Sequence, residues 1–436
     1  MRCGARAARG YHEAGSFFHE TRSLNRSAPQ CESPRLFRAT VVNPLGPEDC
    51  RVHVDGGVRV RAGRIEAVGP IERVAQGLEA ETLDGVIVPG FFDVHIHWVQ
   101  HQVRGAFHAD LLTWLTQHIW PAEMAYADPT RARSDAQTFF ADLLRAGTVG
   151  GMAYSSVHPE ALGAAFACAR GRWRIGNAVM TEGAPAALIG AKPMALSVIA
   201  DLAARYGAER FVVTPRFALN CSPDVLAGLG ALARAGGYWI QTHLAESPAE
   251  LAAVARRFPE ALDYTDVYDR AGLLGPRTVL GHCIHLGARE WDCLAARGCG
   301  IAHCPSSNEA LGSGRMDLAA VRARGIRYAL ASDVGAGPSV SLLHVMQCFL
   351  VQHRAAGERV SAIEALYRAT LAGAELLGWS AESGNLAPGK RADFVLLPKL
   401  GGAFDAEGWL EHVMAGTPAE LERRPLATWL GGSATG

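Results

Sequence analysis

Several features that mark other classes of protein are missing from this sequence. The 42 basic and 43 acidic residues balance, so no excess of positive charge indicates a nucleic-acid or anionic membrane surface. No apolar run reaches the roughly 18 residues of a membrane-spanning helix, and the N-terminus has no signal-peptide core. We therefore expect a soluble protein that binds a small neutral ligand, with no nucleic-acid or membrane partner.

Paired cysteines are also missing. The ten cysteines include no CxxC motif, and their density is far below that of a disulfide-stapled secreted domain. This favours a reducing cytoplasm. Cys293, Cys299 and Cys304 lie near His303, but their spacing matches no zinc-finger pattern, so we interpret them as buried apolar thiols.

The chain divides into a tail, a barrel and a β-rich unit made from both ends. Residues 1–36 are rich in arginine and predict a disordered or over-extended tail, since acidic residues argue against a transit peptide. Short β-rich pieces over 37–88 predict an antiparallel unit. A Gly- and Pro-rich turn and a strong strand follow at 384–398, so 376–436 is expected to complete one small β-sandwich with 37–88.

The remaining segment, 89–375, contains eight apolar strand-like runs separated by helical patterns. Repeated βα units with buried strands predict an α/β fold, a (β/α)₈ barrel. Helices are expected over 223–235, where Pro223 suits a first turn, and over 339–355. The eight predicted strands cover 91–97, 148–156, 173–181, 210–218, 238–246, 277–286, 300–308 and 327–337.

Polar and titratable residues stand at the C-terminal ends of these runs, which is the end that carries the active site in such barrels. His95 and His97 are two apart in a strand, so both imidazoles point to one face. Taken alone, the pair is equally compatible with metal binding and with a structural pair whose hydrogen bonds are satisfied. His243 and Asp333, each late in another strand, would meet it at the rim. Three imidazoles and a carboxylate suit zinc that keeps one position open for water.

The scarcity of lysine limits the number of metal ions. Some barrel hydrolases bridge two ions with a modified lysine on the fourth strand, but the lysines of this chain are Lys192, Lys390 and Lys399, and none lies in a predicted strand. The fourth run offers no carboxylate either. We therefore predict one zinc ion per chain.

Glu246 and His282 are the candidate catalytic residues besides Asp333. Glu246 follows His243 at a strand end, where it can take a proton from water and pass it to a substrate nitrogen. Its alternative is a helix-start carboxylate, because Ser247-Pro248 resembles a helix N-terminus. His282 is expected to hydrogen-bond the water or the substrate, or else to pack in its strand.

A flat polar heterocycle fits the remaining rim residues better than a sugar or a phosphate. Arg216, at the end of the fourth run, offers a fork of donors to a carbonyl, and Phe217 offers an apolar wall. Gln100 carries a donor and an acceptor, which suits an amide-like ring edge, although a solvated loop amide is its alternative. Structural or surface roles are expected for the other rim histidines, which are His101, His285, His303 and His344.

These residues resemble the amidohydrolase superfamily, and within it the guanine deaminases. The broad likeness lies in PGFFDVHIH (89–97), His243, His282, Asp333 and GNLAPGKRADFVLL. The narrower likeness lies in six blocks, LLTWLTQHIWPAE (111–123), VTPRFALNCS (213–222), QTHLAE (241–246), YTDVYDRAGLL (264–274), AHCPSSNEALGSG (302–314) and SDVGAG (332–337).

The resemblance implies a homodimeric zinc enzyme of purine catabolism. It places zinc on His95, His97, His243 and Asp333, and guanine on Gln100, Arg216, Phe217 and Glu246. Zinc-activated water would attack the amino-bearing carbon, Asp333 and Glu246 would handle protons with His282 near the water, and ammonia would leave xanthine.

One segment departs from the family. Where many guanine deaminases have a segment like MDRNAP, this chain has MTEGAP at 180–185. An oxidised guanine such as 8-oxoguanine, or another amino- or halo-substituted heterocycle, is therefore an alternative substrate. A catalytically silent scaffold is a further alternative, disfavoured because every expected ligand is present. HPE at 158–160 lacks the PCxxC of nucleic-acid base deaminases.

Overall fold

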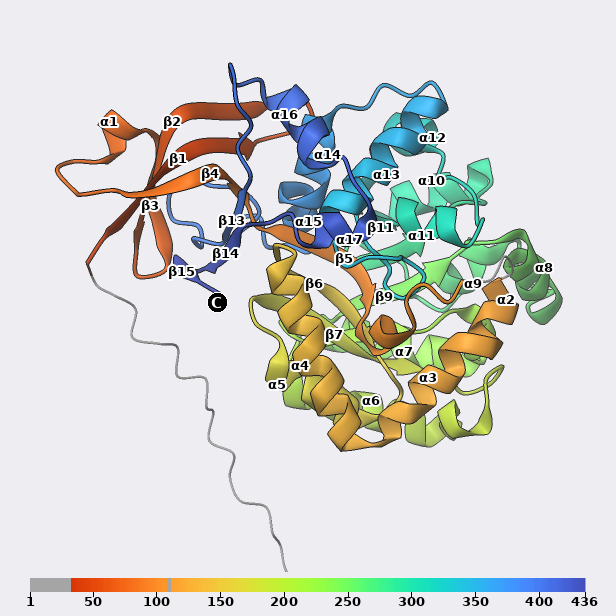
Figure 1. The fold of residues 1–436 in the computed structure, drawn as a ribbon. Coiled ribbons are helices and arrows are strands. Elements are labelled where there is room, and N and C mark those ends of the chain that lie inside the picture. The colour runs from red at the N-terminus through yellow and green to blue at the C-terminus, as the bar shows by residue number, and fades with distance from the viewer. Residues whose placement is uncertain (1–32, 108–110, 436) are drawn as a thin grey trace, which may run out of the picture.

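Two β-sheets organise the chain in this computed structural model, which describes residues 33–107 and 111–435. Figure 1 shows the larger sheet surrounded by helices, and the smaller sheet beside it. The predicted tail, 1–36, lies mostly outside the described residues, and the first strand already begins at Arg35.

The larger sheet has eight parallel strands in sequence order, as predicted. They are β5 (Phe91–His97), β6 (Thr148–Ser155), β7 (Arg172–Val179), β8 (Val212–Pro215), β9 (Trp239–Leu244), β10 (Thr278–His282), β11 (Gly300–His303) and β12 (Arg327–Leu330). The last strand returns to the first, because His97 N donates to Val334 O at 2.8 Å and Asp333 N donates to His95 O at 3.0 Å. The predicted α/β barrel is confirmed.

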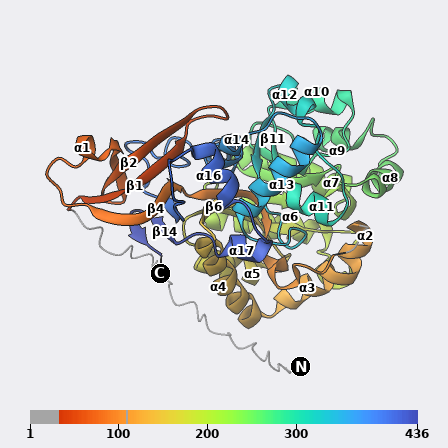
Figure 2. The ribbon, with the colours of Figure 1, turned by 45° about the horizontal axis from the view of Figure 1, so that its top comes forward.

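Helices cover the outside of the barrel (Figure 2). The predicted helices correspond to α7 (Pro223–Gly236) and α13 (Leu342–Ala355). The others between the barrel strands are α2 (Leu111–Trp114), α3 (Trp120–Met124), α4 (Pro129–Arg145), α5 (Pro159–Cys168), α6 (Lys192–Tyr206), α8 (Pro248–Arg257), α9 (Tyr264–Arg270), α10 (Ala288–Arg297), α11 (Pro305–Ala310) and α12 (Leu318–Ala323). A π-helical turn, Leu115–Ile119, joins α2 to α3.

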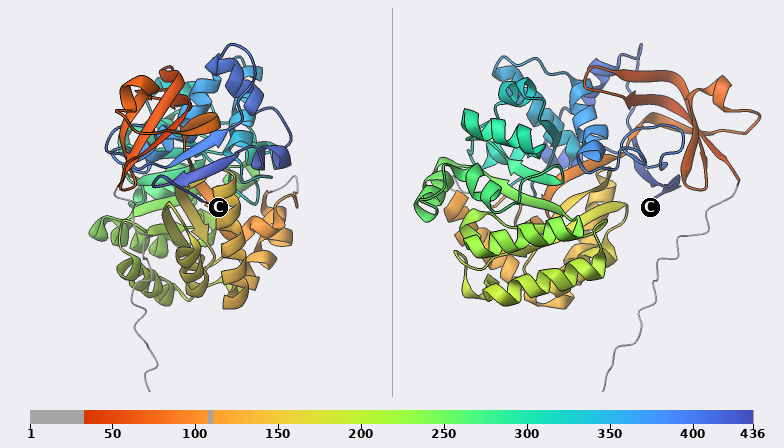
Figure 3. Two further views of the ribbon diagram at one scale, coloured as in Figure 1. Left: turned by 60° about the vertical axis from the view of Figure 1, so that its left-hand side comes forward. Right: turned by 180° about the vertical axis from the view of Figure 1, so that it is seen from behind.

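Segments from both ends of the chain share the smaller sheet (Figure 3). Its strands are β1 (Arg35–Pro44), β2 (Cys50–Arg61), β3 (Arg64–Pro70), β4 (Glu81–Pro89), β13 (Phe394–Leu397), β14 (Ala427–Leu430) and β15 (Ser433–Ala434). The order is β15-β14-β13-β4-β1-β2-β3. Because β1 pairs with β4 in parallel, this unit is mixed rather than wholly antiparallel as expected. The remaining helices are α1 (Ile71–Val74), α14 (Ala362–Ala369), α15 (Leu371–Leu376), α16 (Ala406–Val413) and α17 (Pro418–Glu422).

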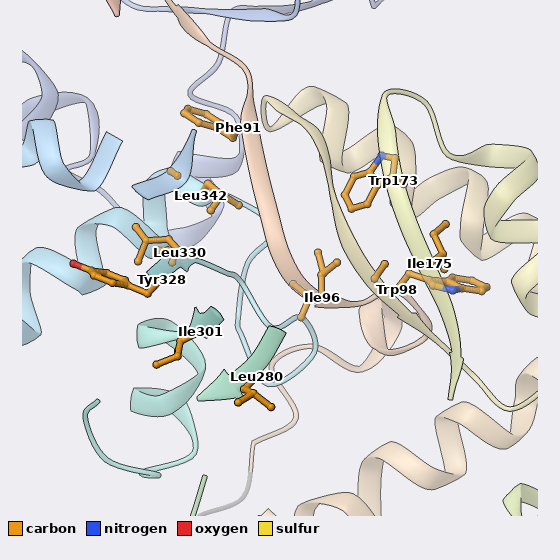
Figure 4. Close-up of a cluster of buried hydrophobic side chains, with 14 of the residues drawn as sticks. Phe91, Ile96, Trp98, Trp173, Ile175, Leu280, Ile301, Tyr328, Leu330 and Leu342 are labelled. Atoms are coloured by element: carbon orange, nitrogen blue, oxygen red, sulfur yellow. The ribbon is translucent and has the colours of Figure 1, made fainter. Parts of the chain in front are cut away.

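Alternation along the strands separates the core from the site. Ile96, Leu280, Ile301 and Leu330 belong to the cluster between strands and helices that Figure 4 draws. Since neighbouring residues of a strand point to opposite faces, burying Ile96 outside turns His95 and His97 toward the barrel axis. Fully burying each such side chain contributes about 1.5–3 kcal/mol, so this register is strongly fixed.

One stretch, Ala186–Tyr206, has the length and hydropathy of a membrane span, with a mean hydropathy of 1.5. Within it, Ile199, Leu202 and Ala203 of α6 are buried in the cluster between strands and helices. Part of the apolar surface of this helix therefore packs against the rest of the protein, and 22% of the 18-residue window is buried.

Candidate active site

Four predicted ligands converge at the C-terminal rim of the barrel. One ligand atom from each of His95, His97, His243 and Asp333 lies within 4.8 Å of all the others. The Nε2 atoms of His97 and His243 are 3.1 Å apart, and Asp333 Oδ1 is 3.3 Å from His95 Nε2 and 3.4 Å from His97 Nε2. Ligand atoms at the usual zinc–nitrogen distance from one ion lie roughly 3–3.5 Å apart when the ion is five-coordinate, so these four atoms fit zinc with a fifth position for water.

The protonation of the imidazoles agrees with a cation site. His243 Nδ1 lies 2.6 Å from the Arg216 carbonyl oxygen, and only a protonated Nδ1 can make that bond. The Nε2 atom of the neutral ring therefore keeps its lone pair toward the cluster. Burial lowers the pKa of His95, His97 and His243, which favours the neutral ligand form of all three.

A second group of potential ligands overlaps the first. It consists of His95, His282, Cys304 and Asp333. Burial raises the pKa of the Cys304 thiol well above its usual value, and its Sγ lies 3.4 Å from the Ala302 carbonyl oxygen. A thiol that stays protonated is a poor ligand, so the group with three imidazoles is the better metal site. Among the described residues, both groups lie at this rim.

Two carboxyl groups at the site differ in their pKa. Burial raises the pKa of Glu246 to about 7. Burial alone would also raise the pKa of Asp333, but its hydrogen bond and charge interaction with His95 hold it below the usual value. Between them lies His282, with Nε2 3.4 Å from Glu246 Oε2 and 3.8 Å from Asp333 Oδ2. The geometry supplies one ionised carboxylate and one carboxyl able to exchange a proton near neutral pH.

The start of helix α8 does not use the Glu246 side chain. Ser247 Oγ accepts from Glu250 N at 3.2 Å, and Glu250 Oε2 accepts from Ser247 N at 3.4 Å, which is a capping box. Glu246 Oε1 instead accepts from Ser313 Oγ at 3.1 Å. Of the two interpretations of Glu246, the structure places its carboxyl in the pocket and gives the helix start to Ser247 and Glu250.

A pocket lies over the cluster, and it brings together the predicted site residues other than His95. The polar part of its lining consists of Gln100, Arg216, His97, His243, Glu246, Glu250, His282 and Asp333, and Phe217 lines it as well. Apolar side chains close the remaining wall, and these are Leu111, Trp114, Leu115 and Ala336. This combination of a flat apolar wall with a few directed polar groups is typical of a small-molecule site.

Glu123 is a site residue that the sequence did not reveal. It lies on α3 with no exposed surface, and Arg216 Nη1 donates to its Oε1 at 2.7 Å and its Oε2 at 2.8 Å. Gln100 Nε2 also donates to Glu123 Oε1, at 2.8 Å. The available signal was an acidic residue in the apolar segment WPAEM, since a buried charge requires a partner.

The backbone is strained where the site residues emerge. Ala245, His282 and Asp333 all have positive φ values, of 54°, 67° and 50°. Each such conformation costs roughly 1–3 kcal/mol for a residue other than glycine, and such strain persists where the surroundings enforce it. These bends turn the chain sharply at the ends of β9, β10 and β12.

The segment 180–185 does not line the pocket. The Glu182 carboxylate pairs with Arg257 of α8 at 2.6 Å, and Asn220 Nδ2 donates to the carbonyl oxygens of Glu182 and Gly183. None of its residues is in the pocket lining, so the departure of this segment from the family changes no side chain that lines the pocket.

The four histidines expected to have structural or surface roles do not line the pocket either. His101 contacts Asp142, His285 contacts the Ser313 carbonyl oxygen, His303 contacts His353, and His344 contacts Cys348.

Comparison with known proteins agrees with this geometry. Residues 86–421 match the model of a family described as the amidohydrolase family. The chain belongs to the amidohydrolase family. This amidohydrolase is 35% identical over 355 residues to guanine deaminase of Escherichia coli (strain K12), covering 79% of this chain and 81% of that protein. It is 34% identical over 417 residues to a probable guanine deaminase of Deinococcus radiodurans, covering 90% and 93%.

The solved structures give the same result. A structure of E. coli guanine deaminase matches the amidohydrolase with a TM-score of 0.86 at 30% identity, over 92% of this chain and 99% of that one. The resemblance inferred from the sequence blocks is confirmed.

Proposed function

We propose that this amidohydrolase hydrolyses guanine to xanthine and ammonia with one zinc ion per chain. The observation that carries the proposal is one pocket whose lining combines the N–H donors of Gln100 and Arg216 with the Glu246 carboxyl and the histidine and aspartate cluster. The family relatives that are named guanine deaminases support it.

The pocket is complementary to a neutral, flat purine. The ring would lie against Phe217 and the apolar wall, and its carbonyl edge would accept hydrogen bonds from Arg216 and Gln100. The carbon that carries the amino group would then face Glu246 and the cluster. The positive charge of Arg216 is paired with Glu123, so the pocket does not require an anionic substrate.

The chemistry needs an activated water and a proton carrier. His95, His97, His243 and Asp333 would hold the zinc ion, which when bound would lower the pKa of water enough to supply hydroxide near neutral pH. Asp333, which stays ionised, accepts a hydrogen bond from the attacking water, and His282 helps to orient it. Glu246 takes a proton and returns it to the leaving nitrogen. A C–O bond forms, the C–N bond breaks, and its electron pair leaves with ammonia.

A single ion is the simplest content for this site. Strand β8, with the sequence VVTP, contains neither a lysine nor a carboxylate that would bridge a second ion. The two candidate ligand groups also share His95 and Asp333, so they cannot hold separate ions with separate ligands.

A panel of heterocycles tests the substrate. The zinc-loaded protein is assayed for ammonia release with guanine, 8-oxoguanine, adenine and an amino-triazine. We expect turnover of guanine with xanthine as the product, and weaker turnover of the others. Preference for 8-oxoguanine or a triazine without activity on guanine would reject guanine as the substrate. A protein without zinc and without turnover of any compound would instead support the scaffold alternative.

A further inference from the structure

A buried carboxylate behind the pocket controls two of the donors that face it. Glu123 touches no reacting group itself, but both of its oxygens bind Arg216 Nη1, and Oε1 also binds Gln100 Nε2. Glu123, Gln100 and Arg216 are exposed by 0%, 1% and 4%, so water does not compete for these bonds.

These bonds fix the orientation of the Gln100 amide. Its Oε1 accepts from Gly335 N at 3.2 Å while its Nε2 donates to Glu123. If the amide rotated by half a turn, its oxygen would face the Glu123 carboxylate and its NH₂ would face a backbone N–H, and both bonds would be lost. The second N–H of Nε2 therefore remains the polar group that Gln100 offers to a ligand.

Arg216 is constrained in the same way. The hydrogen bonds from Nη1 go to Glu123. Nε and Nη2 have no hydrogen-bond partner among the described residues and remain available as donors. The charge of Glu123 balances the guanidinium, so this wall does not select an anion. It offers donors only, without net charge.

We propose that Glu123 makes this wall donor-only, and thereby selects purines with a carbonyl oxygen at position 6 over purines with an amino group there. A 6-oxo group accepts from the wall, whereas a 6-amino group presents a donor to donors. Glu123 is a positioning residue that acts through Gln100 and Arg216. The inference deepens the proposed function and rests on its assignment of a purine to this pocket.

The test compares ligands that cannot lose a 2-amino group. Dissociation constants of hypoxanthine, a 6-oxopurine, and adenine, a 6-aminopurine, are measured on the zinc-loaded wild type and on Glu123→Gln, which preserves the shape of the side chain. We expect the adenine-to-hypoxanthine ratio to fall by roughly tenfold or more, since a charged hydrogen-bond partner is lost. The KM for guanine should rise while kcat changes little.

Glu364→Gln is the matched control. Glu364 is also a buried carboxylate paired with arginines, Arg322 and Arg368, but it does not line the pocket. We expect it to lower the unfolding midpoint and leave the ligand ratio unchanged. An equal fall in the ratio for Glu364→Gln, or an unchanged ratio for Glu123→Gln, overturns the proposal.

Two further outcomes separate this inference from the proposed function. A wild type that prefers hypoxanthine through Glu123 but does not deaminate guanine supports the inference and rejects the function. Deamination of guanine together with an adenine-to-hypoxanthine ratio that Glu123→Gln does not change supports the function and rejects the inference. If Glu123→Gln does not fold, Gln100→Leu carries the test, because removing this donor alone must also lower the ratio, and an unchanged ratio contradicts the proposal.

Discussion

Glu246 and Asp333 are buried carboxyl groups on either side of His282, yet their pKa values move in opposite directions. Burial raises the pKa of Glu246 to about 7, whereas His95 and His282 help to hold that of Asp333 below its usual value. Environments that separate two pKa values in this way assign one group to proton transfer and the other to a fixed charge. The roles we propose for the two residues follow from this difference.

Replacing Glu246 tests the proton-transfer role. Glu246→Gln keeps the side chain's shape but cannot accept or return a proton, so we expect kcat for guanine to fall by about 10²–10⁴. Zinc content should stay at the wild-type level, because Glu246 is not in the ligand group. Steady-state kinetics with metal analysis checks this. A variant with wild-type kcat shows that the proton carrier is another group.

Gly281 allows His95 to pack into the barrel. A Cβ added at Gly281 would lie 2.7 Å from His95 Cε1, closer than real contacts allow. Gly281→Ala should therefore displace the imidazole, lower the bound zinc per chain and reduce activity with it. Gly275→Ala is the control, because a Cβ there meets nothing within 4 Å. Equal zinc content in both variants would contradict this account of Gly281.

Glu123 shows what the sequence could not supply at the scale of residues. It lies on a short helix after β5, and no spacing rule links it to Arg216 or to Gln100. The ligands were predictable because each stands at the end of an apolar strand, and strands of a barrel share one rim. A residue such as Glu123, which reaches the site from a helix between two strands, can be identified as a partner of site residues only from the folded structure.

At the scale of elements, the eight strands were predictable because parallel strands buried on both faces read as apolar runs. The residues at which these strands end were less predictable. The predicted run 277–286 becomes β10 at Thr278–His282, and 300–308 becomes β11 at Gly300–His303, with Pro305 beginning α11. A strand ends where its hydrogen bonds to the neighbouring strand end. The apolar content of one segment does not show where those hydrogen bonds stop.

Strand β10 carries side chains for both the core and the site, so its packing is testable separately. Leu280 is fully buried between strands and helices, and Leu280→Ala should lower the free energy of unfolding by about 2–5 kcal/mol. Val351→Ala on α13 should change it by less than about 0.5 kcal/mol, because Val351 is 61% exposed. Denaturant unfolding measures both, and equal losses would contradict the packing described for β10.

At the scale of the whole molecule, closure of the barrel brings the first and last strands together at the candidate metal site. Asp93 of β5 accepts from Ser332 N at 3.1 Å and from His95 N at 3.3 Å, so it joins the backbone beside two ligands. The ligands are up to 238 positions apart in the chain, from His95 to Asp333. The complete site therefore depends on the closed fold rather than on any local segment.

The most direct measurement is a titration of metal-free protein with zinc, following the rate of guanine deamination and the bound metal together. The account predicts activity that rises in proportion to zinc, and stops rising at one equivalent per chain. Full activity without metal, or activity that appears only with a second equivalent, would contradict the single site formed by His95, His97, His243 and Asp333.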